Sequence, residues 1–154
     1  MAIDAGSALD GESRSGRHVM AVRGYYEDTD FSGVVYHASY LRFMERGRTN
    51  MLRLTGAEHR AYFDEADGAR IGFVVRSMAI EFLRPARMDD VLAVITEPDE
   101  VRGASMMLRQ RIARGDELLV DARVRVACVA GGRARPIPKA LRVAMQTARA
   151  QLEG

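Results

Sequence analysis

The chain has 154 residues, of which 47% are hydrophobic and 29% charged, which suits one soluble globular domain with a core of ordinary size. Lys and Arg number 23 against 21 Asp and Glu, a net charge of +2, and this balance disfavours a nonspecific nucleic-acid binder. The single cysteine, Cys128, excludes an internal disulfide and a cysteine-based metal site.

The first segment differs in composition from the rest of the chain. Residues 1–16 are rich in Gly, Ser and acidic residues, which predicts a flexible N-terminal arm before a single domain over residues 17–154. We expect neither a signal peptide nor a membrane span, because no apolar stretch approaches the roughly 18 residues that a membrane span needs. Together with the lone cysteine, this favours a cytoplasmic location.

A strand and a long helix are the first predicted elements of the domain. Val, Met and Tyr predict a strand over Arg17–Tyr26, and the acidic, Gly-containing residues 27–33 predict a turn. Apolar residues then recur at helical spacing over residues 40–54, which predicts an amphipathic helix. Ser39 is the expected N-cap and Gly56 the expected C-terminal stop.

Beyond a polar, irregular stretch over residues 57–70, the apolar residues recur with the period of a strand. Four strands and a final amphipathic helix are predicted: Ile71–Leu83, Val91–Glu97, Ala104–Arg114, Glu117–Val129 and the helix Lys139–Leu152. Short links between these strands favour antiparallel neighbours. The order predicts an α+β fold with a five-stranded antiparallel sheet, one long central helix and a short C-terminal helix.

Two features of this arrangement suggest close packing and assembly. Gly47 lies in mid-helix, where it costs about 1 kcal/mol relative to Ala, so we expect another backbone to approach the helix closely there. One helix covers only part of a five-stranded sheet, so a dimer is expected.

Residues with chemical potential concentrate in the segment YYEDTDFSGVVYHASYLRFMERGR, from Tyr25 to Arg48. A helix N-terminus offers backbone N–H groups that can stabilise an oxyanion. A carboxylate just upstream can act as general base or nucleophile. Acyl transfer needs these two functions. Glu27 and Asp28, by contrast, are expected to face solvent or pair with Arg.

The motif DxxGVVxHxxY, from Asp30 to Tyr40, resembles the signature of the 4-hydroxybenzoyl-CoA thioesterase family. The wider pattern YYEDTD…GVVYHASYL…MERGR is most similar to its Tol–Pal-associated acyl-CoA thioesterase branch. The resemblance covers about residues 18–142 and includes FVVR at 73–76 and Ile137-Pro138. One departure is Gly24, where the family usually has Val or Ile.

This resemblance implies a hotdog fold, in which the antiparallel sheet wraps around the helix, and an acyl-CoA thioesterase that uses no metal or organic cofactor. It also implies homodimers or homotetramers with active sites at subunit interfaces. Asp30 is the implied catalytic carboxylate, acting either as a nucleophile or as the base that activates water. The backbone N–H near His37 is the implied oxyanion site, and participation of the His37 ring stays open.

Five further residues are expected to contact the acyl-CoA substrate. Arg102 lies where the family has phosphate-contacting basic residues, and Arg135 is a second candidate because Arg binds phosphate well. Phe73 is expected to line the acyl pocket, and Tyr36 and Ser105 complete the set. The acyl chain and the choice between CoA and acyl-carrier-protein thioesters stay open.

Three other functions compete with hydrolysis. A non-catalytic acyl-CoA sensor on the same fold would lack the working carboxylate, whereas Asp30 stands in an intact motif. A hotdog dehydratase would need a His and an acid in a different motif. An RNA-binding domain calls for exposed aromatic residues on strands, but the chain has five Tyr, five Phe and no Trp, and four of the Tyr cluster at the candidate site.

Overall fold

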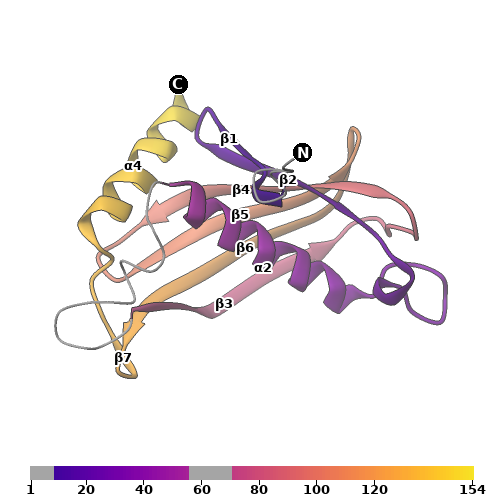
Figure 1. Cartoon of the computed structure of the whole chain (residues 1–154), viewed down its shortest axis with the longest axis horizontal. Coiled ribbons are helices and arrows are strands. Elements are labelled where there is room, and N and C mark those ends of the chain that lie inside the picture. Colours follow the sequence, from indigo (N-terminus) through magenta and orange to yellow (C-terminus); the bar gives the residue numbers. More distant parts are fainter. Residues whose placement is uncertain (1–8, 56–70) are drawn as a thin grey trace, which may run out of the picture.

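The strands of this computed structural model, which describes residues 9–55 and 71–154, form one antiparallel sheet (Figure 1). They are β1 (Glu12–Arg14), β2 (Arg17–Arg23), β3 (Gly72–Phe82), β4 (Val91–Val101), β5 (Ser105–Arg114), β6 (Glu117–Ala130) and β7 (Arg133–Ala134). Their order is β1-β2-β4-β5-β6-β3, with β7 paired to β6. The five predicted strands are confirmed, and the short β1 and β7 raise the number to seven.

Strand β6 illustrates how the sequence pattern builds the sheet. Alternate residues from Val120 to Cys128 are buried against the helix side. Asp121 and Arg123, between them, point to the other face, where the Asp121 carboxylate lies 3.2 Å from the Arg109 guanidinium. The period-two pattern therefore separates an apolar inner face from a charged outer face.

The helices are η1 (Tyr26–Asp28), α2 (His37–Leu54) and α4 (Lys139–Glu153). α2 runs diagonally across the inner face of the sheet, and α4 packs near one end of it (Figure 1). α2 begins at His37, so the expected cap at Ser39 is wrong: Ser39 is buried inside the first turn, and its hydroxyl donates to the Asp28 carbonyl at 3.0 Å. The predicted stop at Gly56 and the stretch 57–70 lie outside the described residues.

Gly47 lies where α2 meets β4 and β5. A Cβ at this position would lie 3.0 Å from Val94 Cγ1 and from Thr96 Oγ1, and 3.3 Å from Gln110 Nε2. The expected close approach is present, although side chains make it instead of a backbone. The Gln110 amide donates to the Met44 carbonyl and to Thr96 Oγ1, both at 2.9 Å, which fixes α2 against the sheet.

The N-terminal segment is described from Leu9 onward. There it contains β1, which pairs with β2 in a hairpin whose turn at Gly16 packs against Ala148 of α4. Flexibility of residues 1–16 stays a prediction, and residues 1–8 lie outside the described part. No helix within residues 9–55 and 71–154 is long and apolar enough to cross a membrane.

Candidate active site

The segment between η1 and α2 is a tightly bonded loop. The Asp30 N–H donates to the Val34 carbonyl at 2.9 Å, and the Gly33 N–H donates to the Asp30 carbonyl at 3.1 Å. Gly33 has φ of +85°, a conformation that favours glycine. The Tyr36 N–H then bonds to the Asp28 carbonyl at 2.8 Å, so the loop returns to its own start just before the helix.

The Asp30 carboxylate is exposed and held in one orientation. Its Oδ1 accepts hydrogen bonds from the Ser32 hydroxyl at 2.6 Å and from the Ser32 backbone N–H at 2.8 Å. These two bonds, with smaller contributions from the Val34 backbone and the charge of His37, lower the pKa of Asp30 below its ordinary value. The side chain is therefore an ionised carboxylate at neutral pH.

The N-terminus of α2 lies beside this carboxylate. Tyr36 occupies the N-cap position and makes no side-chain cap hydrogen bond. The Ser39 N–H donates to the Tyr36 carbonyl at 2.8 Å, so the N–H groups of His37 and Ala38 are the ones left for an incoming group. The His37 ring is exposed, with its centroid 4.4 Å from that of Tyr36 and 6.1 Å from that of Phe82 on β3. A partial positive charge at a helix start favours a developing oxyanion.

Buried polar groups anchor this loop to the fold. Tyr40 Oη accepts the Ala86 N–H at 2.9 Å, and burial raises the pKa of Tyr40. Glu27 is exposed and Asp28 pairs with an arginine, as expected, although Asp28 is buried. The Asp28 carboxylate accepts the Tyr25 N–H at 2.9 Å and lies 3.8 Å from the Arg42 guanidinium. Asp28 therefore stabilises η1, the turn that precedes Asp30.

The departure at Gly24 has a steric cause. A Cβ on Gly24 would lie 3.0 Å from the Arg87 carbonyl oxygen and 3.4 Å from Val35 Cγ2. The Gly24 N–H and carbonyl also bond to Asp90 and Asp89. A larger residue at this position would push the 86–90 turn away from the loop that carries Asp30.

The other four predicted site residues gather at the opposite end of β3. Phe73 pairs in register with Cys128 of β6, whose carbonyl accepts the Arg135 N–H at 2.9 Å. Ser105 starts β5, and its carbonyl accepts the Arg102 N–H at 2.8 Å.

The Arg102 guanidinium pairs with Glu100 at 2.8 Å and is exposed. Phe73 and Phe82 stand about 30 Å apart along an extended strand. A single chain thus brings Asp30, Tyr36 and His37 into one group and Phe73, Arg102, Ser105 and Arg135 into another.

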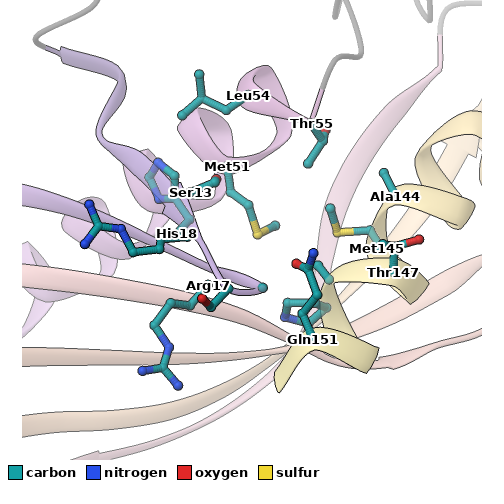
Figure 2. A pocket seen from close by; sticks show the side chains of 15 residues that line it. Ser13, Arg17, His18, Met51, Leu54, Thr55, Ala144, Met145, Thr147 and Gln151 are labelled. Carbon is teal, nitrogen blue, oxygen red and sulfur yellow. The ribbon is translucent and has the colours of Figure 1, made fainter. Parts of the chain in front are cut away.

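A cavity of about 570 Å³ lies at the far end of α2, between the β1–β2 hairpin and α4 (Figure 2). His18, Met51 and Met145 are among the residues that line it. None of the seven predicted site residues is part of its lining. Since α2 spans 18 residues, or about 27 Å, this cavity is remote from Asp30.

Ser32, which donates two hydrogen bonds to the Asp30 carboxylate, is a site residue that was not predicted from the sequence. Its position two residues after Asp30 is typical of a turn in which an Asp side chain accepts bonds from residue i+2. That spacing could have identified it, whereas the contact between Tyr40 and Ala86 joins residues 46 positions apart and has no local signal.

Comparisons with known proteins agree with this architecture. The model of the thioesterase-like superfamily matches residues 26–145. The acyl-CoA thioesterase YbgC of Haemophilus influenzae is 44% identical over 125 residues, which cover 80% of this chain and 90% of that protein. The acyl-CoA thioester hydrolase YbgC of Escherichia coli O157:H7 is 46% identical over 123 residues, covering 78% and 89%.

Solved structures show the same fold. A probable thioesterase from Bartonella henselae has a TM-score of 0.75 and 42% identity, and the match covers 79% of this chain and 99% of that one. A 4-hydroxybenzoyl-CoA thioesterase has a TM-score of 0.77 at 24% identity, covering 84% and 98%, and shares the fold. The chain therefore has the hotdog fold and belongs to the thioesterase-like superfamily.

Proposed function

We propose that this protein hydrolyses acyl-CoA thioesters to a free acid and CoA. The observation that carries the proposal is an ionised, exposed Asp30 carboxylate beside the uncapped N-terminus of α2. The relatives that share 44% and 46% of their aligned residues with this chain are named for the same activity. Assignment to the Tol–Pal-associated branch and a cytoplasmic location are parts of the proposal that rest on the sequence.

The reaction uses the two groups in different ways. Asp30 supplies the electron pair, either by attacking the thioester carbonyl carbon or by removing a proton from the attacking water. Negative charge then develops on the carbonyl oxygen, which receives a hydrogen bond from the N–H at the start of α2 near His37. Collapse of the intermediate breaks the C–S bond, and the departing thiolate takes a proton from solvent or from Asp30 if Asp30 has acted as the base. On the nucleophilic route, water then hydrolyses the mixed anhydride, which releases the acid and restores the Asp30 carboxylate.

Hydroxylamine separates the two routes. Direct attack by Asp30 forms a mixed anhydride, an activated acyl group that hydroxylamine converts to a hydroxamate. Water activation leaves no such group on the protein. Hydroxamate formation that leaves the rate of CoA release unchanged therefore indicates the nucleophilic route, because hydroxylamine that attacked the thioester in place of water would raise that rate.

A complete site requires a second subunit. β3 is the last strand of the sheet order, and no described residue pairs with its outer edge. Large apolar side chains are exposed here: nearly half of the surface of Val74 and Val75 in β3 is exposed, as is nearly half of Leu83, which follows the strand. Phe31, next to Asp30, is fully exposed. Monomeric proteins seldom leave a long apolar edge strand open. We therefore propose a homodimer that covers this edge.

The antiparallel pairing of two β3 strands about a two-fold axis would also join the two groups of site residues. The end of β3 near Phe82 and His37 would then adjoin the Phe73 end of the second copy. In this arrangement Arg102 of the partner subunit and Arg135 of the partner subunit supply positive charge for the CoA phosphates. The acyl group would enter between α2 and β3, and Phe73 of the partner subunit would line the entrance to this space.

Release of free thiol from a panel of acyl-CoAs tests the activity. We expect the wild type to release CoA and Asp30→Asn to lose at least about 100-fold in kcat, with an unchanged circular dichroism spectrum. Glu27→Gln is the matched control, because it neutralises an exposed acid in the same turn, and it should retain wild-type rates. Full activity in Asp30→Asn would refute the catalytic assignment.

The alternative function, a non-catalytic acyl-CoA sensor, gives a different result in the same experiment. A sensor would bind acyl-CoA, detected by calorimetry, while neither the wild type nor Asp30→Asn released thiol. The ionised state of Asp30 favours the enzyme, since a sensor has no use for an exposed carboxylate at the carbonyl.

A further inference from the structure

Arg48 has no role in the chemistry described above, yet it lies on the same side of α2 as His37. Leu41 follows His37 by four residues, and Arg48 follows Leu41 by seven. At 3.6 residues per turn these three side chains project in nearly the same direction. Both ends of this row face the sheet, because the His37 ring lies 6.1 Å from the Phe82 ring of β3 and Arg48 donates a hydrogen bond to Gln110 of β5.

The Arg48 guanidinium is partly buried and has one hydrogen-bond partner among the described residues. Its NH1 donates to Gln110 Oε1 at 2.9 Å, and burial lowers the pKa of Arg48. Gln110 is fully buried, and its amide nitrogen is committed to Met44 and Thr96, so its oxygen is fixed toward Arg48. This bond orients the guanidinium and uses one of its five N–H donors.

No carboxylate among the described residues neutralises this cation. The negative charge of Glu45 acts to raise the pKa of Arg48, but the Glu45 carboxylate is exposed and accepts a hydrogen bond from the Thr49 hydroxyl at 3.0 Å. Arg114, another half-buried arginine, has such a partner, since it lies 2.7 Å from Asp90. A partly buried arginine that stays charged and unpaired indicates a binding site for an anion.

The position of Arg48 sets the distance of this anion from the reacting carbonyl. Arg48 and His37 are eleven residues apart on α2, which is about 16 Å along the helix axis. Side chains on a helix lean toward its N-terminus, so the guanidinium lies closer to His37 than its Cα does. An acyl chain of medium length spans such a gap, and the intervening Leu41 offers it an apolar surface.

We propose that Arg48 binds a carboxylate at the far end of the acyl group, so that the preferred substrates are CoA thioesters of medium-chain dicarboxylic acids. The inference rests on the proposed thioesterase function and on the acyl group lying along α2. The carboxylate replaces water around the remaining N–H donors of Arg48 in a charge-assisted pair, while the thioester end lies at Asp30.

Wild-type selectivity is the first test, since it needs no variant. The substrates are decanoyl-CoA, decanedioyl-CoA and the ω-methyl ester of decanedioyl-CoA, which keeps the length and removes the charge. We expect decanedioyl-CoA to exceed both others in kcat/KM by about tenfold or more. Hexanedioyl- and tetradecanedioyl-CoA, which place the carboxylate short of or beyond Arg48, should lose this advantage.

Variants then assign the selectivity to Arg48. Arg48→Met should lower kcat/KM for decanedioyl-CoA by about ten- to a hundredfold and leave decanoyl-CoA within about threefold. Arg46→Met is the matched control, because Arg46 is exposed and projects from the opposite side of the same helix. Arg46→Met should leave kcat/KM unchanged for both decanoyl-CoA and decanedioyl-CoA. If Arg48→Met does not fold, Arg48→Lys, which keeps the charge without the planar fork, should retain part of the preference.

The outcomes separate this inference from the proposed function. Hydrolysis of decanoyl-CoA and decanedioyl-CoA at equal kcat/KM would overturn the role of Arg48 and leave the thioesterase intact. An Arg48→Met variant that changes oligomeric state but not the substrate ratio would assign Arg48 to the subunit interface instead. Absence of hydrolysis with every thioester would refute the proposed function and this inference together.

Discussion

Substitution of Gly47 by Ala should destabilise the protein, although the same change stabilises an ordinary exposed helix. The gain in helix propensity is about 1 kcal/mol. Against it, the new Cβ lies 3.0 Å from Val94 Cγ1 and Thr96 Oγ1, whereas carbon atoms pack best at about 3.5–4.0 Å. Val94, Thr96 and Gln110, which surround this position, are fully buried, and Gln110 is held by three hydrogen bonds. These side chains can therefore move only slightly to make room for the added methyl group.

Overpacking of this kind costs about 1–3 kcal/mol, and the tight neighbours place Gly47 in the upper part of that range. The net loss in unfolding free energy is therefore about 1–2 kcal/mol, which corresponds to a fall in Tm of about 2–8 °C at this chain length. Urea and thermal unfolding, followed by circular dichroism at one fixed protein concentration, measure both quantities. Gly103→Ala is the control, because a Cβ there meets nothing within 4 Å. A Gly47→Ala variant more stable than the wild type would refute this account of the helix–sheet contact.

Four further predictions concern the site. Ser32→Ala removes the hydroxyl bond that contributes most to lowering the pKa of Asp30, so the acid limb of the pH–rate profile should move to higher pH; an unchanged limb would mean that Asp30 does not titrate in it. Asp30 in the wild type should likewise favour folding above its unfolded pKa, an effect lost as pH falls through the folded pKa. Tyr40→Phe leaves the buried Ala86 N–H without its acceptor and should cost about 1–3 kcal/mol in urea unfolding. Arg102→Ala should raise KM for acyl-CoA more than for acyl-pantetheine, and equal increases would remove Arg102 from the phosphate site.

The sequence predicted the regular elements well because their patterns are local. Strict alternation identified β6, and helical spacing identified α2. The start of α2 was misplaced because Ser39 has the chemistry of a cap but bonds to Asp28, eleven residues earlier, and only the folded loop brings that carbonyl near. β1 was missed because three exposed polar residues form a strand only through pairing with β2.

The sequence predicted which residues belong to the candidate site better than it predicted where those residues lie in the fold. The motif from Asp30 to Tyr40 located one group of residues, since a single loop and helix start carry them all. The second group consists of Phe73, Arg102, Ser105 and Arg135. Its members meet because β3, β5, β6 and the link to α4 converge at one end of the sheet, and only the strand order and register place these elements together. Arg48 gave no signal in the sequence, because the lack of a neutralising carboxylate among residues 9–55 and 71–154 is visible only once those residues are placed in space.

The two hydrogen bonds from Ser32 make the oxygens of Asp30 unequal. Both bonds end on Oδ1, and no described residue donates to Oδ2. The more basic lone pairs are therefore those of Oδ2, and rotation of the carboxylate is already suppressed before a substrate arrives. Since the loss of that rotational freedom occurs during folding, it does not add to the activation entropy of the chemical step. In the proposed reaction, Oδ1 is therefore the fixed support of the side chain, and Oδ2 is the atom that reacts.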